Sequence, residues 1–170
     1  MSLYATNRRL HYWASAFLFL PLAVIICSGL LLQVKKQVPW VQPAEQRGTG
    51  TSPTITLEAV LAAVGTTRAG AGAGWDAVNR VDLRPAKGIA KVWLTNGWEV
   101  QVDLVNGAVL HEAYRRSDLI ESLHDGSFFA GDWSKLGLFL PAGVALALMW
   151  GTGLWMFARP ILQRRRRASP

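Results

Sequence analysis

Cysteine and charged residues are both scarce in this sequence. Cys27 is the one cysteine among 170 residues, which excludes an intramolecular disulfide framework and any metal site built from several cysteines. Charged residues make up 17% of the chain, whereas a typical soluble domain has roughly 25%. An ordinary soluble domain with a charged surface is therefore a poor description of the whole chain.

Acidic residues are missing from both ends. Seven basic residues lie before Trp13 or after Ala158 with no acid among them, and residues 13–158 hold 11 basic and 11 acidic residues. The net charge of +7 therefore belongs to the ends, which argues against a nucleic-acid partner because such a partner needs a basic patch on a folded surface. The run Arg164, Arg165, Arg166 and Arg167 predicts contact with the membrane surface or a topology signal.

Two long stretches contain no charged residue. Residues 13–32 and 136–158 are each long enough to cross a hydrocarbon core of about 30 Å, so both are predicted to be transmembrane helices. The first run is longer than a signal-peptide core and lacks a small-residue cleavage site, which favours a retained anchor. The basic ends predict that residues 1–12 and the tail 159–170 are cytoplasmic. The stretch between the helices is then periplasmic, in a bacterial inner membrane.

The segment between these helices divides into three parts. Residues 33–55 include a stretch rich in Gln, Pro, Gly, Thr and Ser and are predicted to be a linker. Residues 56–116 are predicted to form a small α+β domain, and residues 117–135 an amphipathic helix or loop that leads into the second span. Thr56 is a predicted helix N-cap, and Leu57, Val60, Leu61 and Val64 fall on one apolar face.

Strand-like patterns follow the predicted helix. They cover residues 78–83, 89–95, 98–104 and 108–111. Asn96-Gly97 and Asn106-Gly107 separate the last three, and this dipeptide favours a type I′ hairpin turn. The sequence therefore predicts one helix followed by an antiparallel meander of three or four short strands.

The motifs of the chain resemble two associated families. Thr56-Leu57-Glu58-Ala59-Val60, Asn96-Gly97-Trp98-Glu99-Val100 and Asn106-Gly107-Ala108-Val109-Leu110 resemble a PepSY domain. Arg9-Leu10-His11-Tyr12-Trp13, Ser28-Gly29-Leu30, Leu123-His124-Asp125-Gly126 and Thr152-Gly153-Leu154 resemble the PepSY-associated transmembrane family. Together with the two predicted spans, the resemblance implies a hairpin of two transmembrane helices with an inserted PepSY-like periplasmic domain. This chain departs from larger family members, which have about four spans.

The resemblance also makes His11 and His124 candidate ligands of haem b. Larger relatives are thought to use helix histidines to pass electrons to ferric siderophores. The predicted topology places these two histidines on opposite sides of the membrane, so one chain does not bring them to one iron. A symmetric dimer is the arrangement that pairs His11 with His11 or His124 with His124. Otherwise His11 is an interfacial residue and His124 a helix-end residue. No metal other than this haem iron is predicted.

Two further sets of residues suggest contacts. Asp118, Glu121 and Asp125 form an acidic stripe at helical spacing, which is either a docking surface or the solvated face of an amphipathic helix. Small residues permit close packing of helices, either within the chain or against a partner. They are Ser28, Gly29, Gly143, Gly151, Thr152 and Gly153.

Three functions follow from these patterns. The first is a non-catalytic accessory, assembly or regulatory subunit of a larger membrane complex of redox or transport type, because no catalytic constellation is complete. The second is a haem b electron carrier for ferric-siderophore reduction. The third, implied by the occurrence of PepSY domains in peptidase propeptides, is a periplasmic modulator of a protease. The predicted partners are the lipid bilayer and either another membrane protein or a second copy of the chain.

Overall fold

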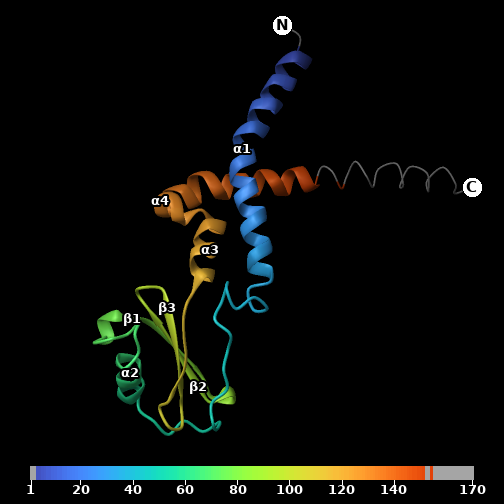
Figure 1. Ribbon diagram of the computed structural model, residues 1–170. Helices are drawn as coiled ribbons and strands as arrows, with labels where there is room; N and C mark the ends of the chain where they lie inside the picture. Colours follow the sequence, from blue (N-terminus) through green and yellow to red (C-terminus); the bar gives the residue numbers. More distant parts are fainter. Residues whose placement is uncertain (1–2, 152–153, 155–170) are drawn as a thin grey trace, which may run out of the picture. The chain divides into compact units, whose positions relative to one another are not determined.

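The protein forms two compact units. A computed structural model describes residues 3–151 and 154 (Figure 1). One unit comprises residues 1–30 and 121–170 and is called the helical unit below; the other comprises residues 31–120 and is called the sheet domain. Helix α3 (Arg116–Asp125) begins in the sheet domain and ends in the helical unit.

The helical unit contains two helices that are long and apolar enough to cross a membrane. Helix α1 (Leu3–Gln33) includes the apolar stretch Ser15–Gln33. The second apolar stretch, Ser127–Gly151, begins with α4 (Ser127–Ser134) and passes through a π-helical turn, η3 (Lys135–Phe139), into regular helix. The predicted stretches 13–32 and 136–158 are helical wherever the structure describes them.

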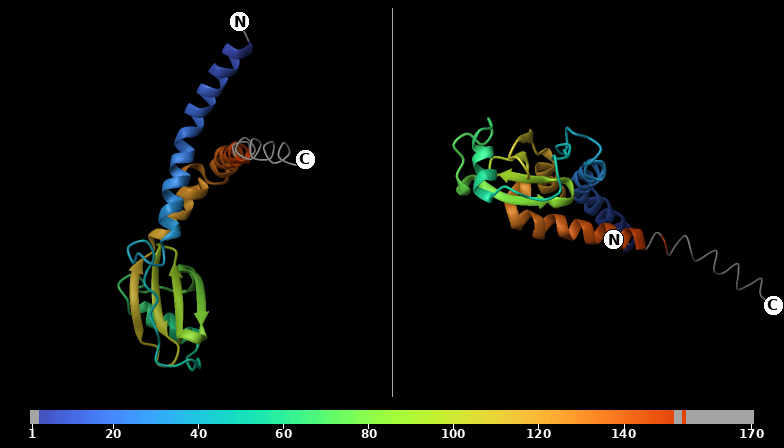
Figure 2. Two further views of the ribbon diagram at one scale, coloured as in Figure 1. Left: turned by 90° about the vertical axis from the view of Figure 1, so that its right-hand side faces the viewer. Right: turned by 90° about the horizontal axis from the view of Figure 1, so that it is seen from below.

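The sheet domain is an antiparallel meander with one helix packed on it, as Figures 1 and 2 show. Its strands lie in the order β1-β2-β3-β4. Their bounds are β1 Val78–Arg84, β2 Ile89–Leu94, β3 Trp98–Asp103 and β4 Val109–Tyr114, with short 3-10 turns η1 (Trp75–Ala77) and η2 (Pro85–Lys87) around β1. The predicted α+β domain with an antiparallel sheet is confirmed.

Helix α2 (Leu57–Gly65) covers one face of this sheet. Thr56 caps the helix by accepting a hydrogen bond from the backbone N–H of Ala59. The helix packs its buried valines on alternate residues of β2 and β3; together these residues are Val60, Val64, Ala90, Val92, Leu94, Val100, Val102 and Leu104. Leu57, at the first position of α2, is exposed, so the valines Val60 and Val64 are the buried residues of this predicted face.

The Asn-Gly turns differ from the prediction. Gly97 and Gly107 have positive φ angles of 83° and 74°, but no described residue other than glycine has one. A type I′ turn needs positive φ at both central residues, so that prediction is wrong. Three residues, 95–97, join β2 to β3, and a left-handed glycine in third position suits such a loop.

The opposite face of the sheet is covered by an extended segment, residues 41–50, which we call the strap. The backbone N–H of Gln46 donates to the Gln101 side chain, and that of Thr49 donates to the Asp103 carboxylate, each at 2.8 Å. Gln101 in turn donates to the carbonyl of Ala44 at 3.0 Å. This part of the predicted linker is therefore hydrogen-bonded to β3.

Candidate functional site

His124 is the best-positioned functional residue of the helical unit. Its Nδ1 atom lies 3.0 Å from the hydroxyl of Ser28 and 3.1 Å from the carbonyl oxygen of Ile25, both on α1. The structure therefore brings together His124 and Ser28, which the sequence suggested for two different roles, cofactor binding and helix packing. The side chain of His124 is half-buried.

The carbonyl oxygens beside His124 favour a proton on its Nδ1 nitrogen. The Ile25 carbonyl, 3.1 Å from Nδ1, can only accept, and the Ser28 hydroxyl donates to the carbonyl of Val24 at 2.5 Å. With Nδ1 as the donor, Nε2 is the ring nitrogen left to accept or to bind a ligand. A metal-binding histidine usually has this arrangement, in which one ring N–H is fixed by a carbonyl and the other nitrogen holds the metal.

Two glycines permit the packing around this histidine. A Cβ on Gly29 would lie 3.2 Å from Cε1 of His124, so the small residue lets the imidazole approach α1. Gly126 has a φ of 81°, and a Cβ there would lie 2.3 Å from the ring of Phe139. Gly29 therefore allows His124 of α3 to pack against α1, and Gly126 allows the turn after α3 to pack against Phe139.

A largely apolar pocket adjoins His124. Its volume is about 460 Å³, and its lining includes Ile25, Phe139, Leu140 and Val144 together with Asp125 and Lys135. The last two form an ion pair at 2.7 Å. The hydrogen bond from Lys135, with further hydrogen bonds from Ser127, lowers the pKa of Asp125 to about 2. The pocket thus has an apolar body and an ionised pair at its edge.

His11 lies too far along α1 to share an iron with His124. His124 contacts α1 at Ile25, which follows His11 by 14 residues. At 1.5 Å per residue these α1 positions are about 21 Å apart. This separation agrees with the expectation that one chain does not bring both histidines to one haem. The side chain of His11 is outside the described residues, as are Thr152, Gly153 and Arg164, Arg165, Arg166 and Arg167.

The acidic stripe is engaged within the chain. Asp118 accepts hydrogen bonds from the Arg115 guanidinium at 3.0 and 3.2 Å, and Asp125 pairs with Lys135. Glu121 also has an interaction. Their use as a docking surface stays a prediction, and these pairs already give the carboxylates a structural role.

A buried charged cluster in the sheet domain escaped the sequence interpretation. Glu99 is fully buried and accepts from Arg115 at 2.5 Å, and its other oxygen lies 3.2 Å from the ammonium of Lys91. Arg115 also stacks on Trp93, with Arg80 on the same ring, at 3.7 and 3.5 Å from the ring centre. In the sequence, Glu99, Gln101 and Asp103 alternate with valines, which suggests that their side of the strand faces water. The strap that covers this side has the composition of a linker, so the sequence gives little sign that these residues are buried.

Two findings bound the chemistry of the chain. Across residues 3–151 and 154, no group of three or more His, Cys, Asp or Glu residues could hold a metal ion. Comparisons with protein-family models, with curated proteins and with solved structures found no match. The function has to be inferred from the geometry of the chain itself.

Proposed function

We propose that this chain is a non-catalytic PepSY-type protein of the bacterial inner membrane and acts as an accessory, assembly or regulatory subunit of a larger redox or transport complex. The observation that carries the proposal is the exposure of large apolar side chains along both long helices. Only 11% of the Ser15–Gln33 window and 17% of the Ser127–Gly151 window are buried. A core helix of a soluble protein is mostly buried, so lipid and a partner's helices suit these surfaces.

The glycines of the second apolar helix support a partner. A Cβ on Gly143 or Gly151 would meet no atom of the described residues within 4 Å outside its own helix backbone, whereas one on Gly29 would meet His124. Gly29 is therefore used for packing inside the chain. Gly143, which lines the pocket beside His124, and Gly151 leave room for another helix to approach closely.

The test of this proposal is the purification of the tagged full chain in a mild detergent. We expect a second membrane protein, or a second copy, at a fixed molar ratio. Gly143→Leu and Gly151→Leu should abolish that association and leave the fold unchanged, because a Cβ at either position would meet no described atom within 4 Å outside its own helix backbone. Ala145→Leu is the matched control, since it places the same side chain about 200° around the helix from Gly143. A monomer, or association that survives both glycine variants, would contradict the proposal.

The proposed topology has its own test. In a Cys27→Ser background, a single cysteine at Ser52 should react with a membrane-impermeant maleimide added to the periplasmic side. A cysteine at Ser169, in the basic tail, should react only after the membrane is opened. Labelling of the two positions in the reverse order would place the sheet domain in the cytoplasm.

A haem b carrier is the second candidate, and the contact of Nδ1 of His124 with the Ile25 carbonyl favours it. Nε2 of His124 would hold the iron, and the apolar lining of the adjacent pocket would exclude water. When bound, the haem would supply one-electron transfer. His11 of the same chain would not be a second ligand of that iron, so a haem held by one histidine or by a dimer of the chain is the form that fits.

The visible spectrum of the purified protein, before and after dithionite, tests the haem. A reduced b-type spectrum with one iron per chain or per dimer should disappear in His124→Ala and remain in His111→Ala, whose histidine lies on β4. A flat spectrum from cells supplied with haem would reject this candidate and leave the accessory-subunit proposal standing.

A further inference from the structure

The sheet domain contains a polar pocket that none of the functions above uses. Its volume is about 260 Å³, smaller than the roughly 300–1,000 Å³ of sites for drug-sized ligands. Four of the residues that line it are cationic and one is acidic. The lining consists of Lys36, Gln42, Pro43, Glu45, Arg84, Lys87 and Lys91.

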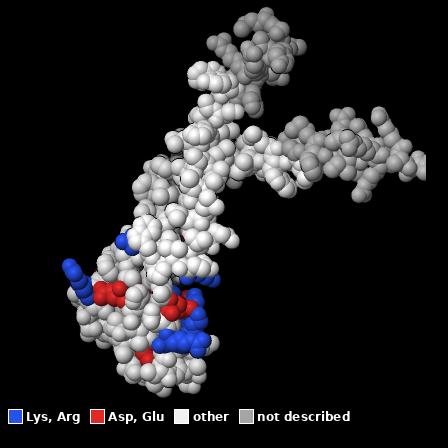
Figure 3. Space-filling view, turned by 45° about the vertical axis from the view of Figure 1, so that its right-hand side comes forward, with Lys and Arg blue, Asp and Glu red and all other residues white. Residues whose placement is uncertain are grey.

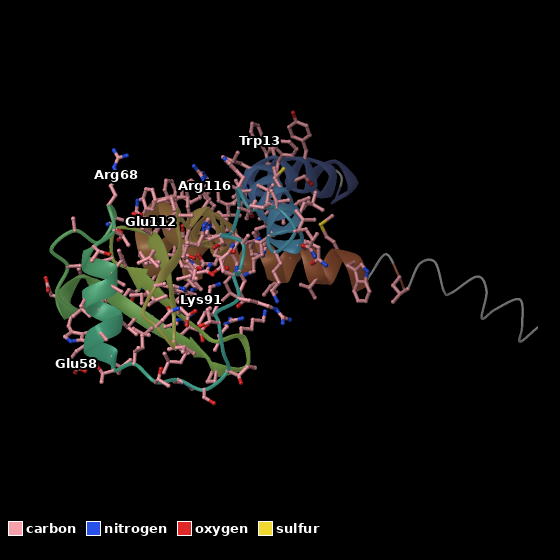
Figure 4. All side chains as sticks on the ribbon, turned by 60° about the horizontal axis from the view of Figure 1, so that its bottom comes forward. Trp13, Glu58, Arg68, Lys91, Glu112 and Arg116 are labelled. Carbon is pink, nitrogen blue, oxygen red and sulfur yellow. The ribbon has the colours of Figure 1, made fainter. Side chains whose placement is uncertain are left out.

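Lys91 is the most buried of these cations. It extends from β2, is labelled in Figure 4, and has only 2% of its surface exposed. Glu99, at 3.2 Å, is its one ion-pair partner among the described residues, and Glu99 shares its carboxylate with Arg115. A buried ammonium with half of one carboxylate still favours a further anion, because little water is present to screen its charge.

Two of the other three cations, Arg84 and Lys87, are held at the pocket by Glu45. Its carboxylate pairs with Arg84 at 2.7 Å and with Lys87. Burial raises the pKa of Glu45, but the hydrogen bond from Lys87 and the charge of Arg84 outweigh it, so the pKa lies below its ordinary value. Glu45 therefore stays ionised near neutral pH and fixes the positions of two cationic side chains.

Lys36 links the pocket to the end of the first apolar helix. It is exposed and follows the last residue of α1, Gln33, by three positions. In a membrane-anchored chain, a residue this close to the end of the span lies at headgroup level. Figure 3 shows Lys, Arg, Asp and Glu side chains adjacent on the sheet domain, while the described parts of the helices are almost entirely white.

We propose that this pocket binds a phosphate group, supplied either by a phospholipid headgroup or by a soluble phosphate ester. Lysine ammonium groups suit a phosphate as point charges. The Arg84 guanidinium adds a fixed positive charge beside them, since its Nε and Nη2 donate to Asp82 and its Nη1 donates to Glu45. The Gln42 amide is a further donor of the lining. The small volume suits the phosphate group and excludes a large ligand body. The lipid source rests on the proposed membrane location; binding of the phosphate group itself does not.

Titration of the full chain with inorganic phosphate in a neutral detergent tests the pocket, with chloride at equal ionic strength as reference. We expect saturable binding by calorimetry. The double variant Lys36→Gln/Lys87→Gln should bind at least about tenfold more weakly, since two charges are lost. Arg68→Gln is the matched control; Figure 4 shows Arg68 pointing away from the body of the domain, so its affinity should match the wild type.

Glu45→Gln should change the phosphate affinity in the opposite direction. It removes the one carboxylate of the lining, so phosphate should bind more tightly, by about three- to tenfold. A residue that only supports the fold would not produce this gain. Unaltered circular dichroism in each variant separates loss of binding from loss of structure, and Lys36→Gln alone, at an exposed position, should still weaken binding.

Nanodiscs distinguish the two sources. If a phosphatidylglycerol headgroup fills the pocket, phosphate binding should weaken in phosphatidylglycerol discs, and native mass spectrometry should show fewer retained lipids in the double variant but not in Arg68→Gln. If the ligand is a soluble ester, glycerol phosphate should bind equally in discs and in detergent. The proposal is overturned if neither phosphate nor lipid binds, or if the double variant binds as the wild type does.

Discussion

The sheet domain and the helical unit place charge and apolar surface in opposite ways. The sheet domain buries Lys91, Glu99 and Arg115 behind the strap. The helical unit leaves Phe19 and Trp150 more than two-thirds exposed. A charge removed from water needs a partner within the protein, and an exposed apolar surface needs a partner outside it. The sheet domain thus pairs each of these buried charges within the protein, whereas the helical unit depends on its surroundings for its apolar surface.

Removal of the Glu99 carboxylate should cause the largest loss of stability among the variants considered below. Glu99→Ala leaves Lys91 and Arg115 without their shared carboxylate, and breaking a buried ion pair costs about 3–5 kcal/mol of unfolding free energy. Urea unfolding of the full chain in detergent, followed by tryptophan fluorescence, measures the loss. Glu58→Ala, at an exposed position of α2, should cost less than about 1 kcal/mol. Equal losses in the two variants would show that the buried cluster contributes little.

A pair of leucines compares the two units directly. Leu104 is 2% exposed in the sheet domain and Leu148 is 66% exposed in the helical unit. Leu104→Ala should cost about 2–5 kcal/mol through the cavity it leaves. Leu148→Ala should cost less than about 0.5 kcal/mol, as at other positions with few contacts. The same urea titration tests both, and a large loss for Leu148→Ala in isolated protein would mean that this helix packs within the chain.

Gly126 should be the sensitive glycine of the helical unit. Gly126→Ala places a side chain at positive φ and against Phe139, with an expected cost of about 1–3 kcal/mol. Gly137→Ala, where a Cβ would meet nothing within 4 Å, should instead gain up to about 1 kcal/mol from helix propensity. Thermal unfolding followed by far-ultraviolet circular dichroism distinguishes them. Similar melting temperatures would show that the helical unit tolerates rearrangement at Gly126.

The Asp125–Lys135 ion pair should make a small contribution to stability that is lost only at very low pH. The pKa of Asp125 lies at about 2, below its ordinary value of 3.8, so the folded state favours the ionised form. Its contribution is present above pH 3.8 and lost as the pH falls through 2. Because the pair is partly exposed, it should contribute less than about 1 kcal/mol. Asp125→Asn should remove this part of the acid dependence, and NMR titration of the carboxyl carbon should report the low pKa directly.

In the sheet domain, Asp103 provides the contrasting case. Burial raises the pKa of Asp103, but hydrogen bonds from the backbone N–H groups of Val105 and Thr49 outweigh burial and leave the pKa below its ordinary value. Asp103→Asn would keep the shape and lose the charge, so it should weaken the attachment of the strap. A pKa for Asp103 at or above its ordinary value would contradict the geometry of these bonds.

Local signals predicted the elements that depend on local interactions. Thr56 caps α2 and the strands alternate around Val92 and Val100, because capping and alternation depend on neighbours within a few residues. The turn type at Asn96-Gly97 was missed, since a dipeptide does not determine whether the loop has two or three residues.

Contacts between distant residues could not be predicted in the same way. His124 and Ser28 are 96 residues apart, and no pattern in either motif indicates the other. The burial of Glu99 depends on the strap, which has few apolar residues and the composition of a linker. A polar strand face therefore looked solvated in the sequence although an extended segment covers it.

The strap also implies an order of events as the chain is made. Its residues leave the ribosome before the strands do, but Gln46 and Thr49 bond to side chains 55 and 54 positions later. Until β3 has emerged and paired, these backbone groups have no partner except water. Proline and glycine in the strap disfavour strand formation, which keeps it from joining a sheet early. The meander should therefore assemble first and the strap close over it last, enclosing the charged cluster in the final step.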